Sequence, residues 1–285
     1  MISYINNTDI ALKRAILKAQ LQGELFDFSS LNTNANFNSS NNTLTWNSGN
    51  TSGLGYIAPK SAGVVSFNIK TSNSYPITRL GDKNFDLSVK VEIESPTVPD
   101  FLSASTTSTY NVINFDSKVS GKISLTSAAY FRDANSGILN NGNMPPKVGQ
   151  PTDFTIHWAL KSFATDFNGI EVRVPLNDGV KFTGVATSNY GNPPVYEAST
   201  SEMVWTLDSL PANKGFVDSP AEAVFQIEAT PSSSQVANYM PLLGETTMTA
   251  TDAFTSNSIS SQLTPITTAL PDDTTIGQQG GVVQP

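Results

Sequence analysis

One pattern occurs twice along these 285 residues and limits what the chain can fold into. The run Thr43–Trp46 resembles Met203–Thr206 when their tryptophans are aligned, and Val65–Lys70 matches Ala223–Glu228 at nearly the same spacing. Each run alternates apolar and polar residues, the period of a strand with one buried face. A chain of this length also suits two domains. The repeat therefore predicts two similar domains built from β-strands.

The composition favours strands and turns over helices. Hydrophobic residues make up 38% of the chain and charged residues only 14%, with Ser, Thr and Asn in place of the missing charges. These side chains compete for backbone hydrogen bonds inside helices, whereas Thr suits strands and Asn and Ser suit turns. With 19 Gly and 17 Pro, the composition is typical of many short strands joined by turns.

Charge and residue usage exclude several classes of function. The net charge of −8 argues against binding to nucleic acid or to anionic lipid, both of which require a basic face. The absence of cysteine excludes disulfides, thiol catalysis and zinc–thiolate sites, and it fits an extracellular protein. No apolar run is long enough to insert into a membrane, and no targeting segment is recognisable at the start of this chain.

The fold class expected is all-β, with two tandem immunoglobulin-like β-sandwiches. The predicted boundaries are residues 1–118 for the first sandwich, 119–271 for the second with an inserted loop around 133–150, and 272–285 for a flexible tail or linker.

The first copy is expected to lack its N-terminal strand. Ile2–Ile5 matches only part of the alternating strand Thr152–Leu160, and nothing precedes it that corresponds to the strand Lys122–Phe131. We therefore expect the chain to derive from a longer protein.

The segment Asp9–Gln22 permits two interpretations. Its Ala, Leu, Lys, Arg and Gln residues have high helix propensity, and Asp9 could cap a helix. However, Ala15, Leu17, Ala19 and Leu21 alternate with polar residues, and the second copy has a strand at the same place. The repeat favours a strand.

The second copy resembles a conserved repeat domain of unknown function that occurs in tandem in bacterial and archaeal surface proteins. The resemblance rests on Gly149–Ile156, Ile170–Phe182, Val204–Leu207 and Thr249–Asp252. The sequence departs from the family pattern where Pro175 precedes the Leu of the second motif. The resemblance implies an exported immunoglobulin-like sandwich without catalytic residues, whose partners are neighbouring repeats of the same longer chain.

Few residues suggest chemistry. His157 is the only histidine and lies in an alternating strand, where a structural role is expected because metal sites and catalytic triads need partners at defined spacing. Trp46, Trp158 and Trp205 are expected to be core residues, since large rings commonly fill the space between two sheets. We expect no catalytic residues, no cofactor-binding residues and no enzymatic activity.

Calcium is the one candidate ion, and it would need oxygen ligands from the loops. No run matches the spacing of an EF-hand loop. The candidate ligands are Asp116, Asp252, Asp272 and Asp273.

The function expected is a non-catalytic structural or spacer segment of an exported cell-surface protein, such as a stalk, envelope component or adhesin. The alternative is a binding module for a glycan or for a protein of the cell envelope or of a neighbouring cell. That module would use exposed aromatic residues in loops of the second domain, with candidates Tyr190, Tyr196 and Phe216.

Overall fold

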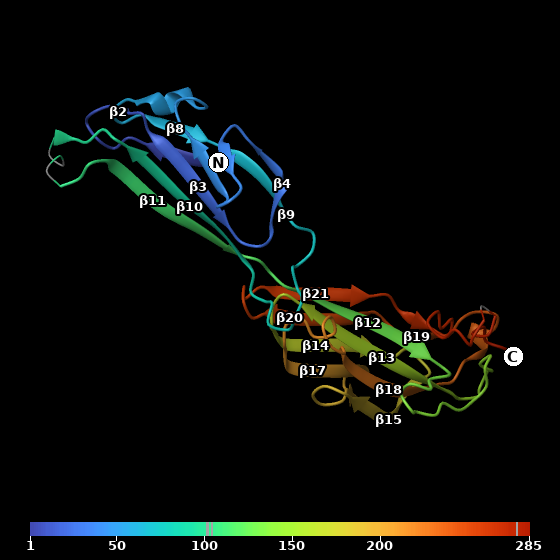
Figure 1. The fold of residues 1–285 in the computed structure, drawn as a ribbon. Coiled ribbons are helices and arrows are strands. Elements are labelled where there is room, and N and C mark those ends of the chain that lie inside the picture. Colours follow the sequence, from blue (N-terminus) through green and yellow to red (C-terminus); the bar gives the residue numbers. More distant parts are fainter. Residues whose placement is uncertain (101–102, 104, 278) are drawn as a thin grey trace. The chain divides into compact units, whose positions relative to one another are not determined.

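The chain forms two compact units in a computed structural model that describes residues 1–100, 103, 105–277 and 279–285. Unit 1 comprises residues 1–76 and 85–119, and unit 2 comprises residues 77–84 and 120–285 (Figure 1). The described residues are almost entirely strands and turns, so the predicted all-β class is confirmed. None of the described helices is long and apolar enough to cross a membrane.

Unit 1 contains one five-stranded antiparallel sheet of order β11-β10-β3-β6-β5, together with the strand pairs β1-β8, β2-β7 and β4-β9. Its elements are β1 (Ile2–Ile5), β2 (Leu12–Lys13), β3 (Ile16–Gln22), β4 (Phe26–Thr33), β5 (Asn36–Asn38), β6 (Thr43–Trp46), the 3-10 helix η1 (Ser52–Gly55), β7 (Tyr56–Ile57), β8 (Ala62–Val65), β9 (Phe67–Thr71), β10 (Asp86–Ser95) and β11 (Thr109–Lys118).

The core of unit 1 explains why its first long segment is a strand. Leu17, Ala19 and Leu21 of β3 are each at most 1% exposed, while Ile16 is 42% exposed on the other face. Alternation of this kind buries one side of a strand, and it outweighs the helix propensity of the same residues. The strand packs beside Trp46, which is fully buried.

Unit 2 contains a four-stranded antiparallel sheet of order β12-β13-β18-β15, a five-stranded antiparallel sheet of order β16-β17-β14-β20-β21, and the pair β19-β22. Its elements are β12 (Lys122–Tyr130), β13 (Thr152–Phe163), β14 (Phe167–Pro175), β15 (Val180–Ser188), β16 (Val195–Glu197), β17 (Glu202–Leu210), β18 (Ala221–Ala229), η3 (Ser233–Gln235), β19 (Pro241–Leu243), β20 (Thr246–Asp252), β21 (Ser258–Leu263) and β22 (Ile266–Thr267).

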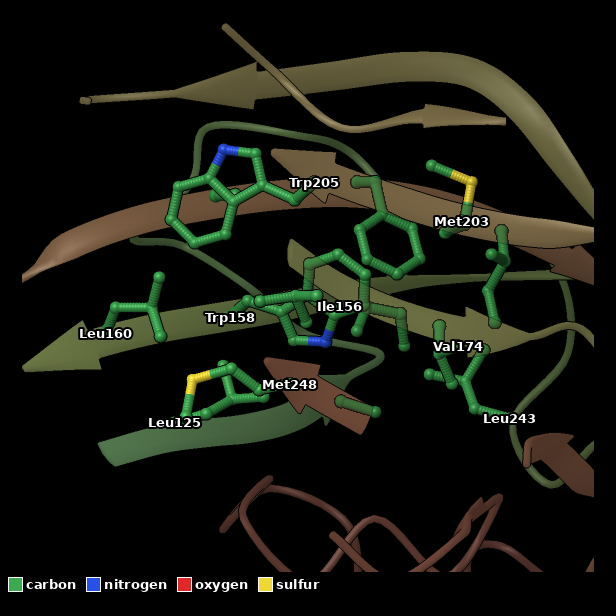
Figure 2. Packing of buried hydrophobic residues seen from close by; sticks show 14 of the residues in the cluster. Leu125, Ile156, Trp158, Leu160, Val174, Met203, Trp205, Leu243 and Met248 are labelled. Atoms are coloured by element: carbon green, nitrogen blue, oxygen red, sulfur yellow. The ribbon is translucent and has the colours of Figure 1, made fainter. Parts of the chain in front are cut away.

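The core of unit 2 lies between its two large sheets (Figure 2). Trp158 of β13 meets Phe225 of β18 edge to face, with 4.9 Å between ring centroids. Trp205 of β17 is 1% exposed and belongs to the same core. Burial of side chains of this size stabilises the fold by roughly 2–3 kcal/mol each. All three tryptophans are buried, as the sequence predicts.

The two units share a strand order, which gives the sequence repeat a structural counterpart. The order β5-β6-β3-β10-β11 in unit 1 matches β16-β17-β14-β20-β21 in unit 2. Registers agree as well, because Leu17 is opposite Trp46 and Val172 is opposite Trp205. Unit 2 also has strand β12 beside β13, and the described part of unit 1 has no counterpart of it.

A flexible tail is predicted over residues 272–285, but described residues near both ends of this range pack on unit 2. Val283 is 1% exposed and Asp273 is 3% exposed. The amide of Val283 donates to the carbonyl oxygen of Asn238 at 3.0 Å, and the amide of Ala237 donates back to Val283 at 3.0 Å. The Gly- and Gln-rich composition of this segment favours a flexible tail. It does not indicate the packing, because only a few apolar residues make the contact.

The predicted boundary near residue 118 agrees with one of the positions at which the chain changes unit, and there are further ones at residues 76–77 and 84–85. Residues 77–84 lie between β9 and β10 of unit 1 in sequence, yet they belong to unit 2. The inserted loop around 133–150 separates β12 from β13 and contains no strand in the structure.

Candidate functional site

A hollow lined by many polar groups lies on the outer face of the sheet β12-β13-β18 in unit 2. Its volume is about 630 Å³, and its lining includes Tyr130 of β12 and His157 of β13. The segments 132–136 and 272–275 also line the hollow. Outward-facing positions of the strands form its base because alternate residues of a strand point to opposite faces.

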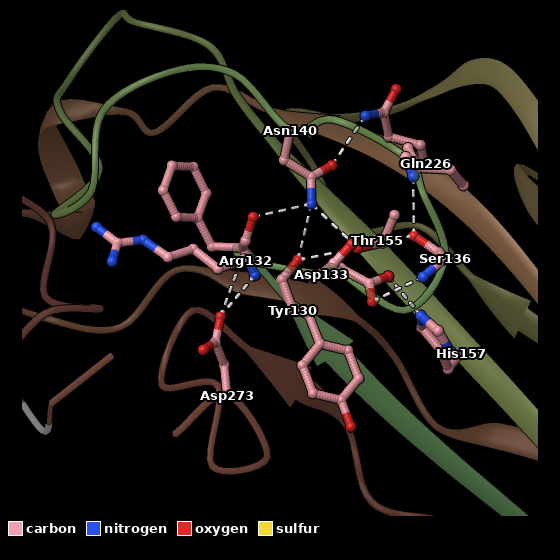
Figure 3. A network of polar contacts seen from close by, with 11 residues as sticks. Tyr130, Arg132, Asp133, Ser136, Asn140, Thr155, His157, Gln226 and Asp273 are labelled. Carbon is pink, nitrogen blue, oxygen red and sulfur yellow. Dashed lines mark hydrogen bonds and ion pairs between the residues drawn. The ribbon is translucent and has the colours of Figure 1, made fainter. Parts of the chain in front are cut away.

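His157 and Asp133 form the closest polar pair in this hollow (Figure 3). The imidazole Nε2 lies 2.5 Å from Asp133 Oδ2, and the side chains are 22% and 4% exposed, respectively. Burial acts to raise the pKa of Asp133, but hydrogen bonds from His157, Ser136 and Thr155 outweigh it and hold the pKa below its usual range. The carboxylate is therefore ionised at neutral pH.

Tyr130 borders the same pair. Its ring meets the imidazole of His157 edge to face, with 5.2 Å between centroids. Burial, followed by the negative charges of Asp272, Asp133 and Asp273, raises the pKa of the Tyr130 phenol. The phenol of Tyr130 is therefore neutral at neutral pH.

Next to this hollow, Asn140 and Gln226 attach the inserted loop to the sheet. Asn140 Nδ2 donates to the carbonyl oxygens of Tyr130 and Phe131 at 3.2 and 3.0 Å, and to Thr155 Oγ1 at 3.0 Å. Gln226 of β18 donates to Asn140 Oδ1 at 2.8 Å (Figure 3). These hydrogen bonds join the inserted loop to strands β12, β13 and β18, which indicates that the network holds the loop on the sheet.

Two of the predicted calcium ligands have their carboxylate oxygens committed to backbone amides. Asp252 is fully buried, and it accepts hydrogen bonds from the amides of Phe254 (2.8 Å), Thr255 (3.1 Å) and Gly121 (2.8 Å). It therefore joins the end of β20 to the residue preceding β12. A cation at this carboxylate would have to displace three amide donors.

Asp273 has a similar environment elsewhere in unit 2. Its Oδ2 accepts from the amides of Phe131 and Arg132 at 3.0 and 2.9 Å, and its Oδ1 accepts from the amide and hydroxyl of Thr275. Asp272 is exposed beside it, and Asp116 is exposed on β11 of unit 1. No three His, Cys, Asp or Glu residues in the described ranges are grouped as metal ligands. The structure thus does not bring the four aspartates together.

The predicted aromatic candidates occupy three separate places. Tyr190 is half-buried with the ammonium of Lys214 above its ring, 5.8 Å from the centroid. Tyr196 is 40% exposed and packs on Phe182, whereas Phe216 is 55% exposed and packs on Phe163. Each ring has a partner within unit 2, and no contact joins the three candidates into one platform.

The sequence interpretation missed an ion cluster on the outer face of the other large sheet. Arg173 of β14 contacts the carboxylates of Glu171 (2.6 Å), Glu197 (2.7 Å) and Glu202 (3.1 Å), which connects three adjacent strands. The hydrogen bond with Glu171, followed by that with Glu197, raises the pKa of Arg173. The alternation of Glu171 and Arg173 on one face was the available signal, since residues two apart in a strand are neighbours.

Comparisons with known proteins give no family assignment. No family model matches the chain, and no curated protein matches it, so the resemblance to the surface repeat family stays a prediction.

Solved structures give distant similarities. The full-length major pilin SpaD from Corynebacterium diphtheriae is 12% identical with a TM-score of 0.31, covering 90% of this chain and 59% of SpaD. The major pilin subunit BcpA from Bacillus cereus is 9% identical with a TM-score of 0.32, covering 93% of this chain and 67% of BcpA. The C-terminal domain of the antigen I/II-family protein AspA from Streptococcus pyogenes is 12% identical with a TM-score of 0.28, covering 88% of this chain and 84% of that domain. Such scores do not establish a common fold, so the architecture rests on the strand pairing described above.

Proposed function

We propose that the chain is a non-catalytic structural segment of a cell-surface protein. The observation that carries the proposal is the repetition of one strand order in two units, each with its own hydrophobic core. Domains of this kind each have their own hydrophobic core and can in principle fold alone, so they can be repeated along one chain. The lack of cysteine and the net charge of −8 agree with an extracellular location.

The use of the acidic groups in unit 2 supports a structural role. Asp252 and Asp273 both accept backbone amide hydrogen bonds, and Asp133 joins the inserted loop to His157. Reactive groups in an active site normally keep a face open to substrate. Here the buried carboxylates accept hydrogen bonds from backbone amides. These contacts support a role in stabilising the fold.

Surface exposure on the source cell tests the proposal. Antibodies raised against the purified chain should label intact cells, and external protease should remove the labelled protein. An antibody against a cytosolic protein of the same cells provides the control for lysis. Labelling that appears only after the cells are permeabilised would contradict the proposal.

The alternative function, a binding module, is favoured by the exposed rings of Tyr196 and Phe216. Exposed aromatic rings offer an apolar face to a ligand, and Tyr adds a hydroxyl that can form a hydrogen bond. A glycan array compares the natural chain with Tyr196→Ala and Phe216→Ala variants. Binding that is lost in one variant identifies the ring involved, and a blank array for the natural chain counts against the glycan-binding function.

A further inference from the structure

The outer face of the large sheet in unit 1 has a polar hollow around Lys18. Its volume is about 380 Å³, within the range of roughly 300–1,000 Å³ that small-ligand sites occupy. Leu17 and Ala19 of β3 are buried, so Lys18 between them points away from the core. The lining comes mainly from β3, β5, β6 and β10, and it consists of amide, hydroxyl and charged side chains.

The residue that corresponds to Lys18 in unit 2 is Arg173. The two repeat tryptophans are opposite Leu17 in unit 1 and opposite Val172 in unit 2. The residues that follow, Lys18 and Arg173, therefore occupy the same place on the outer faces of equivalent sheets. Each unit thus has one cation at this position.

The carboxylates that contact Arg173 have neutral counterparts in unit 1. Glu202 corresponds to Thr43, because each residue lies three positions before a repeat tryptophan. Glu197 corresponds to Asn38, because these two residues are the cross-strand partners of Glu202 and Thr43. The cation of unit 2 is thus neutralised by carboxylates of its own sheet, whereas a hydroxyl and an amide take their places in unit 1.

The charge of Lys18 is available to a ligand. Glu92 is its cross-strand neighbour on β10, but Glu92 forms an ion pair with Lys90 at 2.6 Å. Lys18 itself has no ion pair within the described part of the chain, and neither Asn38 Nδ2 nor Thr45 Oγ1 has a hydrogen bond there. Two ammonium groups and one carboxylate line the hollow, so its walls carry a net positive charge in a chain of net charge −8.

A second hollow of about 380 Å³ adjoins the first, and both are lined by Lys18 and Glu92. Tyr110 of β11 is 70% exposed, and together with Ile16 it gives this hollow an apolar surface. Glu94 adds acceptor oxygens to the lining. The C–H groups on one face of a pyranose ring suit such an apolar surface, and its hydroxyls suit the carboxylate.

We propose that the outer sheet face of unit 1 binds a short acidic oligosaccharide, whose carboxylate contacts Lys18. Unit 2 identifies the charged group, because carboxylates take that place beside Arg173. The amide and hydroxyl lining identifies a polyhydroxylated ligand, since these side chains both donate and accept hydrogen bonds. An acidic peptide fits less well, because β3 and β10 are paired on both edges and offer it no main-chain partners. The site is separate from Tyr196 and Phe216 of unit 2.

A glycan array tests the ligand class on the full chain. It contains oligosaccharides of sialic or uronic acid, each paired with a neutral counterpart that lacks the carboxylate. The acidic members should bind, and their counterparts should bind at least about tenfold more weakly, since a charge-assisted hydrogen bond is lost. A failure of all acidic members, or equal binding of the neutral ones, would overturn the proposal. Tighter binding of a Glu-rich peptide would overturn it in favour of an acidic protein partner.

Single variants locate the site. Lys18→Gln should weaken binding of the best acidic member by at least about tenfold. Lys70→Gln removes another exposed lysine of unit 1, on β9, and should leave binding unchanged. Tyr196→Ala and Phe216→Ala should also leave it unchanged. The opposite pattern would place the binding in unit 2 and contradict the proposed site. Because both lysines are exposed, equal melting temperatures of their variants confirm that the fold is retained.

A double variant copies the arrangement of unit 2. Asn38→Glu with Thr43→Glu supplies Lys18 with carboxylates from its own sheet, so binding of the acidic oligosaccharide should be abolished. Asn32→Glu with Asn73→Glu adds the same charge at exposed positions outside the lining of the hollow, and it should retain most of the binding. If the two double variants lose binding equally, general repulsion of an anionic ligand controls it, and the proposal fails.

Discussion

The side-chain amide nitrogen of Asn213 lies 2.8 Å from the carbonyl oxygen of Asp82, although 131 residues separate them. The same nitrogen lies 3.3 Å from the carbonyl oxygens of both Arg79 and Leu80, and Asn213 Oδ1 accepts from the amide of Ala164 at 2.9 Å. Asn213 is fully buried, and its side-chain amide attaches the segment 77–84 to unit 2 together with the amide of Asn84, which donates to the carbonyl oxygen of Ala164 at 2.7 Å.

Asn213→Ala should lower the free energy of unfolding of unit 2 by about 2–4 kcal/mol, because buried carbonyl and amide groups lose their partner. Urea denaturation of the full chain measures this loss of stability from the midpoint of the transition in which unit 2 unfolds. Asn168→Ala is the matched control, since Asn168 is exposed on β14 and its removal should change the stability by less than about 0.5 kcal/mol. Equal losses for the two variants would contradict the anchoring role.

Replacement of two buried tryptophans in unit 2 separates the contribution of a hydrogen bond from that of packing. Trp205 Nε1 donates to the carbonyl oxygen of Asn192 at 2.9 Å, whereas Trp158 Nε1 has no partner among the described residues. Both variants, Trp205→Phe and Trp158→Phe, remove similar ring volume. Trp205→Phe should therefore cost about 1 kcal/mol more, as measured by calorimetry. A larger loss for Trp158→Phe would show that packing dominates both sites.

Acid should destabilise unit 2 through Asp252 and Asp273. Burial raises the pKa of each carboxyl, but hydrogen bonds from backbone amides outweigh burial, and both pKa values lie below the ordinary range. A carboxyl with a lowered folded-state pKa contributes its full stability above its unfolded pKa, near 3.9, and loses it as the pH falls through the folded value. The melting temperature of unit 2 should therefore fall steadily as the pH is lowered below about 4.

Single amide variants test this assignment. Asp252→Asn and Asp273→Asn should each lower the stability of unit 2 at pH 7 by about 1–3 kcal/mol and reduce its dependence on pH below 4. Asp272→Asn changes the same charge at an exposed neighbour and should have little effect. If all three variants behave alike, general charge repulsion and not the amide contacts controls the acid sensitivity.

Calcium should leave the melting temperatures of both units unchanged. A site occupied at 100 times its dissociation constant would stabilise the protein by about 2.7 kcal/mol, which calorimetry resolves easily. Titration with calcium, compared with EDTA, therefore tests the expectation that Asp116, Asp252, Asp272 and Asp273 form no common site. A rise in melting temperature that Asp272→Asn abolishes would show instead that calcium binds near the end of the chain.

Strand periodicity was the part of the structure that the sequence predicted well. Leu17, Ala19 and Leu21 point into the core because their alternation matches the two-residue period of a strand, and Trp46 and Trp205 occupy matching registers. These features are local, so neighbouring residues reveal them.

Contacts between distant polar residues were not predictable in the same way. Asn213 and Asp82 are 131 positions apart in the sequence, and Asp133 reaches His157 from an irregular loop. Neither segment has a periodic pattern that marks the contact. The burial of Val283 was missed for a related reason, since one apolar residue in a polar tail carries almost no pattern.

The indole nitrogens of the two repeat tryptophans donate to different kinds of acceptor. The two acceptor positions therefore tolerate different substitutions during evolution. Trp46 donates to the side-chain oxygen of Asn34, while Trp205 donates to the backbone carbonyl oxygen of Asn192. Every amino acid carries a backbone carbonyl, so position 192 is free to change its side chain during evolution. Position 34 must keep a short side chain with an acceptor oxygen, and we expect related chains to vary at the second position while retaining Asn or Asp at the first.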